Sequence, residues 1–142
     1  MTTAREVMTG ATECASMEDT VTQAARKMRD LGVGALPICG DDNRLKGMIT
    51  DRDIVLNCVA EGMDTTTVKV ADYAGEEVVT IGADDDVTEA LATMARAGVR
   101  RLPVIDGHDL VGMVSQADIA RKLPEQDAGR LLEAISSAPS TD

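Results

Sequence analysis

The sequence has almost no aromatic residues. Phe and Trp are absent, and Tyr73 is the single tyrosine among 142 residues. A core without aromatic rings must be built from Val, Ile, Leu, Ala and Met, and the eight methionines can fill irregular gaps in it. Any ligand is therefore held without an aromatic stacking platform, unless Tyr73 supplies one.

Positive charge is also scarce. Lys and Arg number 14 against 25 Asp and Glu, which gives a formal net charge of -11. Nucleic acids and anionic membrane surfaces are both bound through clustered Lys and Arg. No apolar run has the length of a membrane span, and the N-terminus lacks the features of a signal peptide. We expect no nucleic-acid partner, no membrane partner and a cytoplasmic location, with export by a route without a signal peptide left open.

Catalytic motifs are missing as well. The single histidine, His108, allows no two-histidine metal motif, and the sequence has neither a nucleophile elbow nor a Walker loop. The acidic run 84–86 lacks the ligand spacing of a calcium-binding loop. We predict that the protein is not an enzyme, with no catalytic residue, no metal site and no required cofactor.

The sequence does contain an internal repeat. Residues 21–24 (VTQA) match 87–90 (VTEA), and the same offset of 66 residues relates Leu36-Pro37 to Leu102-Pro103. After a gap of one residue in the following turn, the match continues into the next helix of each copy. Self-similarity of this kind indicates a duplicated structural unit.

Each copy predicts the order β-α-β-β-α. In the first copy an apolar stripe at helical spacing begins at Val21 and ends at Leu31. Thr20 with Gln23 has the spacing of a capping box, and Asp86 with Glu89 occupies the aligned positions. A second helix is expected over 51–60 in the first copy and over 116–123 in the second.

A parallel crossover followed by a hairpin makes this an α+β fold, with small mixed sheets flanked by helices. We expect the first repeat at 4–61, a linker at 62–69, the second repeat at 70–123 and a polar C-terminal tail at 124–142. A unit of this size buries too little surface to be stable by itself, so the two copies should support each other.

Residues 32–38 (GVGALPI) and 45–54 (LKGMITDRDI) resemble the signature of a CBS (cystathionine-β-synthase) domain. The second copy repeats this pattern at 98–104 and 110–119. The resemblance covers nearly the whole span from residue 4 to residue 123. It implies a CBS pair, or Bateman module, whose repeats are related by pseudo-twofold symmetry and which usually forms a homodimer.

The residues with most functional interest are Thr50 with Asp53 and, in the second copy, Ser115 with Asp118. A hydroxyl followed three residues later by an acid is what a helix start requires, so capping explains both pairs. The resemblance implies a second role, in which the hydroxyl contacts a phosphate and the aspartate holds the ribose of an adenine nucleotide. Both interpretations stay open.

The resemblance also implies roles for neighbouring residues of the second copy. Val99, Leu102 and Pro103 would form the wall of an adenine site, although core packing also explains such apolar residues. Thr80 would present a hydroxyl to the ligand, and Arg100 would neutralise phosphates unless it belongs to a solvated basic patch.

Two departures from the family pattern weaken the first-copy site. Cys14 occupies the position of Thr80, and Asp51 places an acid beside the presumed phosphate position. We therefore expect the second-copy site, with Thr80, Ser115 and Asp118, to bind a nucleotide better.

The cysteines have separate expected roles. Cys14 lies on the opening strand of the first copy and Cys39 at the end of the strand after the crossover. Such strands are commonly neighbours, close enough for a disulfide. Cys58 falls on an apolar helical stripe and is expected to be a buried thiol.

Two functions remain. The first is a non-catalytic sensor that binds an adenosine-containing ligand, such as AMP or ATP, in the cleft between its repeats and acts through an unknown protein partner. The alternative is a structural or protein-interaction module, such as a stress-response protein, that keeps the fold without binding nucleotides.

Overall fold

The computed structural model describes residues 1–10, 13–75, 78–122 and 129. The chain divides into two compact units. One comprises Glu13–Val78 and is called here the first-repeat unit. The other, the second-repeat unit, comprises Met1–Thr12 together with Val79–Asp142.

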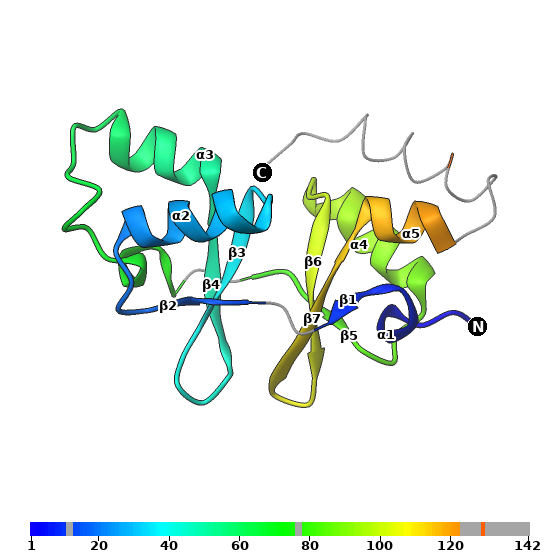
Figure 1. Ribbon diagram of the computed structural model, residues 1–142. Coiled ribbons are helices and arrows are strands. Elements are labelled where there is room, and N and C mark those ends of the chain that lie inside the picture. The colour runs from blue at the N-terminus through cyan, green and yellow to red at the C-terminus, as the bar shows by residue number, and fades with distance from the viewer. Residues whose placement is uncertain (11–12, 76–77, 123–128, 130–142) are drawn as a thin grey trace. The chain divides into compact units, whose positions relative to one another are not determined.

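The first-repeat unit is built on a three-stranded mixed sheet of order β2-β3-β4. Strands β2 and β3 are parallel and are connected through helix α2, and β3 and β4 form an antiparallel hairpin. Figure 1 shows α2 and α3 next to one another, and they are in contact. The elements are β2 (Ala15–Ser16), α2 (Val21–Leu31), β3 (Ala35–Cys39), β4 (Leu45–Thr50), α3 (Asp51–Ile54), the π-helical turn η1 (Val55–Val59) and the 3-10 turn η2 (Val70–Tyr73).

The second-repeat unit repeats this plan and adds one strand. Its sheet has the order β1-β7-β6-β5, with β5 and β6 parallel through α4, and β6 and β7 antiparallel. The predicted α+β fold with small mixed sheets is confirmed. The elements are α1 (Ala4–Val7), β1 (Thr9–Gly10), β5 (Ile81–Gly82), α4 (Val87–Ala97), β6 (Arg101–Asp106), β7 (Asp109–Ser115) and α5 (Gln116–Lys122).

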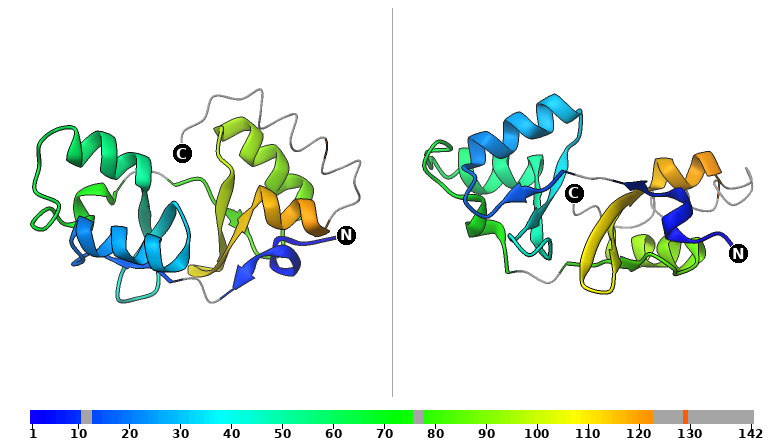
Figure 2. Two further views of the ribbon diagram at one scale, coloured as in Figure 1. Left: turned by 45° about the horizontal axis from the view of Figure 1, so that its top comes forward. Right: turned by 60° about the horizontal axis from the view of Figure 1, so that its bottom comes forward.

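The start of each sequence repeat packs in the unit of the other repeat. At the N-terminus, β1 pairs antiparallel with β7, and α1 contacts α4, α5 and β7 (Figure 2). In the same way η2, which begins the second repeat, lies in the first-repeat unit, where the Val70 amide donates to the Asp19 carbonyl at 2.8 Å. The compact units and the sequence repeats therefore have different bounds.

A glycine permits the N-terminal strand to pair with β7. A Cβ atom at Gly112 would lie 2.6 Å from the Thr9 carbonyl oxygen, closer than real Cβ contacts allow. The aligned Gly47 faces the corresponding segment in the first-repeat unit. A Cβ atom added at Gly47 would lie 3.1 Å from the Ala74 Cα. In both units a glycine therefore lies where an added segment meets the hairpin, and the approach is closer at Gly112 than at Gly47.

Residues 62–69, expected to be a linker, are in part bound to the first-repeat unit. The amides of Val21 and Thr22 donate to the carbonyls of Val68 and Thr65, each at 2.9 Å. The start of α2 is thereby tied to this segment as well as to its own cap.

One of the two predicted helix caps is confirmed. Thr20 and Gln23 form the full capping box, and α2 and α4 end at Gly32 and Gly98, each with φ of 69°. The other expected pair differs, because the Asp86 carboxylate accepts from the amide of Thr88 at 2.9 Å and makes no box with Glu89. The Asp86 carboxylate thus caps the second amide of the helix, whereas Thr20 caps the third.

The expected second helix of the first copy is not uniform. It begins as α3 and continues as η1, where the Ala60 amide donates to the Val55 carbonyl, five residues back, at 2.8 Å. Turns of this kind shift the helical faces by about one residue and often occur at functional sites.

Each unit contains its own cluster of buried aliphatic side chains. In the first-repeat unit all five residues of β3 are buried, and Ile38 and Ile49 are fully enclosed. In the second-repeat unit the cluster includes Met94, Leu102 and Val104. Because β3 carries Ile38 and β6 carries Leu102 and Val104, the loops next to these strands have a rigid base.

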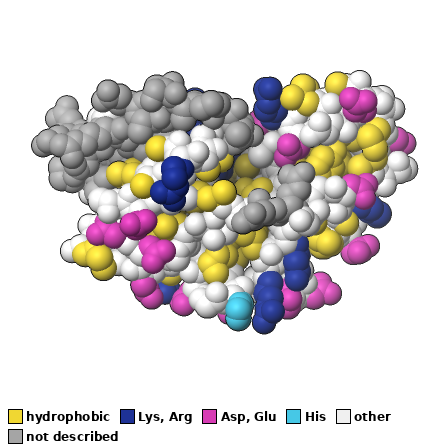
Figure 3. Space-filling view, turned by 180° about the vertical axis from the view of Figure 1, so that it is seen from behind, with side chains coloured by type: hydrophobic (Ala, Val, Ile, Leu, Met, Phe, Trp, Pro, Cys, Tyr) yellow, Lys and Arg dark blue, Asp and Glu magenta, His cyan; other side chains and the backbone are white. Residues whose placement is uncertain are grey.

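The surface carries mixed charges. On the face seen in Figure 3, Lys and Arg side chains are scattered among acidic and hydrophobic ones. No helix in the described part of the chain is long and apolar enough to cross a membrane.

Candidate functional site

The second-repeat unit holds Ser115 and Asp118 together at the start of α5. The Ser115 amide donates to the Asp118 carboxylate at 3.0 Å, and the Asp118 amide donates to the Ser115 hydroxyl at 3.1 Å. The Gln116 amide donates to the Arg100 carbonyl at 2.9 Å, which fixes the loop before β6 against the helix start. Hydrogen bonds thus join Ser115 to Asp118, and the backbone of Arg100 is bonded to the neighbouring Gln116.

Asp118 has a further partner that the sequence analysis missed. Its side chain is buried, and its second carboxylate oxygen, Oδ1, accepts from the exposed guanidinium of Arg121. An acid followed by an arginine three residues later on a helix is a recognisable ion-pair spacing, so this contact could have been predicted.

The first-repeat unit repeats the capping arrangement. The Thr50 amide donates to the Asp53 carboxylate at 2.9 Å, and the Asp53 amide donates to the Thr50 hydroxyl at 3.0 Å. The Arg52 amide is already bound by the Asp51 carboxylate at 2.8 Å. Asp51 thus takes up a backbone donor at the start of α3.

The remaining predicted site residues differ in exposure. Arg100 and Thr80 are exposed, and Thr80 directly precedes β5. Leu102 is completely buried in the hydrophobic cluster and Pro103 is buried beside it on β6, whereas Val99 packs partly buried against the same cluster. The core-packing interpretation accounts for the position of Leu102.

The cysteines are arranged as predicted. Cys14 and Cys39 form a disulfide with Cα atoms 5.7 Å apart, and Cys58 is a buried thiol. Cys14 immediately precedes β2 and Cys39 ends β3, so the neighbouring parallel strands bring them together. The disulfide occupies the position at which the second copy presents the Thr80 hydroxyl.

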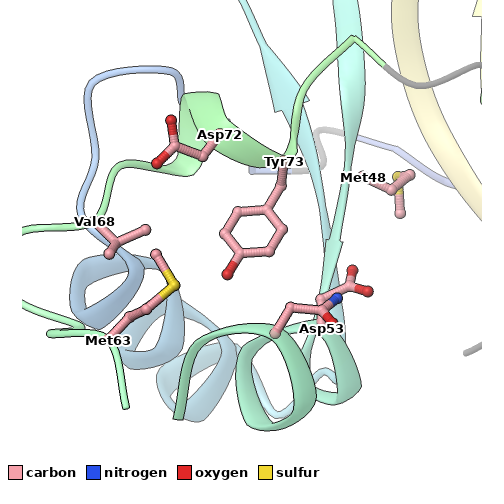
Figure 4. A pocket seen from close by; sticks show the side chains of 7 residues that line it. Met48, Asp53, Met63, Val68, Asp72 and Tyr73 are labelled. Carbon is pink, nitrogen blue, oxygen red and sulfur yellow. The ribbon is translucent and has the colours of Figure 1, made fainter. Parts of the chain in front are cut away.

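The first-repeat unit also contains a pocket of about 310 Å³ that the sequence analysis did not predict. Figure 4 shows the Tyr73 ring projecting between Met63 and Val68 on one side and Asp53 and Met48 on the other. Asn57 and Asp72 complete its lining.

Burial raises the pKa of the Tyr73 hydroxyl above its usual range, and the nearby Cys58, Asp53 and Asp72 add to the rise. All of these groups disfavour the phenolate. The hydroxyl is therefore neutral at physiological pH, in a pocket whose charged lining residues, within the described part of the chain, are Asp53 and Asp72.

Comparisons with known proteins give clear relatives. Hypoxic response protein 1 of Mycobacterium tuberculosis (strain ATCC 25618 / H37Rv) is 46% identical over 137 residues, which cover 96% of each chain. The similarity therefore extends over both copies of the repeat.

Solved structures with the same fold include two that bear on function. A crystal structure described as Hypoxic Response Protein I with two coordinated zinc ions superimposes with a TM-score of 0.81 at 47% identity, covering 87% of this chain and 100% of that one. The CBS domain pair of protein MJ0100, solved with 5-methylthioadenosine and S-adenosyl-L-methionine, has a TM-score of 0.75 at 23% identity, with 86% and 95% covered.

The first of these structures is described with two coordinated zinc ions. Among the described residues, no group of three His, Cys, Asp or Glu side chains is placed to hold a metal ion. Two of the three cysteines form the disulfide, and His108 lies exposed in the turn between β6 and β7.

The model of the CBS domain matches residues 4–59 and again residues 70–125, one match for each copy of the repeat. The repeated strand order, the paired hydroxyl and acid at the start of each second helix and the relatives all agree with that match. The chain therefore belongs to the CBS domain family, as a pair of repeats.

Proposed function

We propose that this protein is a non-catalytic regulatory module that binds an adenosine-containing ligand, with Ser115 and Asp118 of the second repeat as its main polar contacts. The observation that carries the proposal is the hydroxyl and buried carboxylate held side by side at the start of α5. A serine hydroxyl suits a phosphate, and a carboxylate can accept hydrogen bonds from both hydroxyls of a ribose.

The two repeats support the proposal unequally. Asp51 and the disulfide at Cys14 stand in the first copy where the second copy has Gln116 and the Thr80 hydroxyl. An acid beside a phosphate repels it, and a disulfide offers no hydroxyl, so the second repeat is the better candidate. Arg100 is exposed next to it and can meet the negative charge of a phosphate.

A protein of the same fold supports the choice of ligand class. The MJ0100 pair is described in complex with two adenosine-containing compounds. That complex supports the view that this architecture is able to hold an adenosine group.

The second candidate function is a ligand-free interaction module. It is favoured by the ion pair of Asp118 with Arg121, because a ribose would have to displace the guanidinium from the carboxylate. In that case the Ser115 and Asp118 pair serves only to cap α5, and the output of the protein depends on a protein partner.

A thermal-shift screen separates the two candidates. The protein is heated with AMP, ADP, ATP, NAD and S-adenosylmethionine in turn, and a ligand that binds the folded state raises the unfolding temperature. The proposal predicts a rise with at least one of the five that is reduced in Asp118→Asn and kept in Asp53→Asn. No rise with any of them favours the interaction module.

A further inference from the structure

The pocket around Tyr73 differs chemically from a nucleotide site, and this difference identifies another ligand. Its charged lining residues are Asp53, which is half-buried, and Asp72, which is exposed. Neither lysine nor arginine is among the described residues that line it. A phosphate would meet only repulsion here, whereas a cation would be attracted.

One carboxylate oxygen of Asp53 has no hydrogen-bond partner among the described residues. Its Oδ2 accepts from the Thr50 amide, but no side chain in the described part of the chain bonds its Oδ1. In the second repeat the matching oxygen of Asp118 is occupied by Arg121, and the aligned position in the first repeat holds Leu56. The first repeat therefore lacks the internal cation that the second repeat supplies.

The other lining groups suit the carbon skeleton of an organic cation. The Tyr73 ring offers an aromatic face of the kind that attracts ammonium groups. The side chains of Met48, Met63 and Val68 provide apolar contact, and the Asn57 amide oxygen can accept another hydrogen bond. A volume of about 310 Å³ is at the lower end of the range for small-molecule sites.

The pocket lies in the first-repeat unit, and its lining differs from the aligned residues of the second-repeat unit. The position of Tyr73 corresponds to Val7, which is buried in the core of the second-repeat unit. The position of Asn57 corresponds to Lys122, whose positive charge would repel a cation. The pocket is thus no copy of a site common to both repeats.

We propose that the pocket lined by Asp53, Asn57 and Tyr73 binds a small aliphatic amine in its protonated form. The ammonium group donates to Asp53 Oδ1 and to the Asn57 amide oxygen, and its methylene groups lie against Tyr73 and the two methionines. This site uses the aspartate of the first repeat, whereas the nucleotide proposed above uses that of the second.

The single tyrosine provides a specific readout. With no Trp and one Tyr in the chain, the intrinsic fluorescence arises from Tyr73 alone. Titration with putrescine (1,4-diaminobutane) should change this fluorescence in a saturable way, and calorimetry should give the same affinity. 1-Butanol and butyrate, which have four carbons but no ammonium group, should leave it unchanged.

Two variants test the assignment. Asp53→Asn keeps an oxygen for the Thr50 amide, so the helix cap is retained, but it should weaken putrescine binding about ten- to hundredfold through loss of a charge-assisted hydrogen bond. Asp118→Asn, the same change in the other repeat, should leave putrescine binding unaltered. That variant should instead weaken the binding of the nucleotide.

Several results would overturn this proposal. If millimolar putrescine produces neither heat nor a change in fluorescence, the pocket holds no amine. Equal affinity in Asp53→Asn and in the unaltered protein, or equal binding of 1-butanol, would also show that the carboxylate does not select a cation. Each of these outcomes leaves the nucleotide proposal untouched.

Discussion

Asp53 and Asp118 show how one residue in a duplicated unit acquires two environments. Each carboxylate accepts a hydrogen bond from the backbone amide of the Thr or Ser three positions before it. Only Asp118 also accepts from an arginine, because position 121 is Arg and its counterpart in the first repeat is Leu56. The difference between Arg121 and Leu56 therefore gives the two aspartates different charged surroundings.

The disulfide is a stabilising link at the residue scale. Cys14 and Cys39 are 25 residues apart, and closing a loop of that length stabilises a protein by about 3 kcal/mol through the unfolded state. We predict that Cys39→Ala lowers the free energy of unfolding by about this amount, measured by urea denaturation without reductant. Adding dithiothreitol should lower it similarly in the unaltered protein and leave the variant unchanged. A reductant effect of equal size in both would contradict the assignment.

Tyr73 should titrate at unusually high pH. Its pKa is raised by burial first and then by Cys58, Asp53 and Asp72, compared with about 10 for an exposed tyrosine. The folded protein should therefore gain its phenolate absorption at higher pH than the protein unfolded in urea. A group whose pKa is raised on folding contributes stability below its unfolded pKa and loses it as the pH rises through the folded pKa. Stability should accordingly fall above about pH 10. Equal midpoints in folded and unfolded protein would refute this.

At the scale of elements, the pairing of β1 with β7 depends on Gly112. A methyl group there would lie 2.6 Å from the Thr9 carbonyl oxygen, which is backbone and cannot rotate away. We predict that Gly112→Ala destabilises the protein by about 1–3 kcal/mol and increases amide hydrogen exchange in β1.

Gly47→Ala is the matched substitution in the other unit. Its nearest atom is the Ala74 Cα at 3.1 Å, so a small shift relieves the contact and the loss of stability should be smaller. Two results would contradict this: equal stability of the two variants, or amide hydrogen exchange in β1 that is no faster in Gly112→Ala. Either would show that the pairing of β1 with β7 does not require glycine at position 112.

The sequence predicted those elements whose signals are local. The apolar spacing from Val21 to Leu31, the Thr20 box and Gly32 define α2, and all three depend on residues within a few positions of each other. The disulfide was predictable because a βαβ crossover makes β2 and β3 neighbours.

Other features depend on contacts distant in the sequence, which no local pattern records. The exchange of α1 and β1 into the second-repeat unit requires Thr9 to meet Met113, more than one hundred residues away. No residue pattern in the sequence of η1 (VLNCV) indicates a π-helical turn, so the pocket beside Asn57 was not predicted. Tyr73 drew attention as the single aromatic, but its partners come from separate segments.

At the scale of the whole molecule, we propose that the protein is a homodimer. The second helix of each repeat carries several apolar residues, which differ in exposure. Val55 and Val59 are 55% and 57% exposed, whereas Ile54, Cys58 and Ile119 are buried in their own units. Ala120 is half-buried, and Leu123 lies outside the described residues. Exposed valines on one helical turn form an apolar patch of the type that partners cover.

Light scattering tests this dimer. The chain has a mass of 15.0 kDa, and we expect twice that mass at micromolar concentration. Val59→Asp should shift the mass towards the monomer, because a charge would be buried in the interface. The control His108→Asp, in an exposed turn, should stay dimeric. A monomer mass for the unaltered protein would exclude this assembly.

Calorimetry with AMP tests the central claim most directly. The account predicts saturable binding, and Asp118→Ala should weaken it about ten- to hundredfold, since the loss of a charge-assisted hydrogen bond to ribose costs about 1.5–3 kcal/mol. Asp53→Ala should have a much smaller effect, because Asp51 and the Cys14 disulfide disfavour the first repeat. Equally tight binding in Asp118→Ala and the unaltered protein would contradict the account.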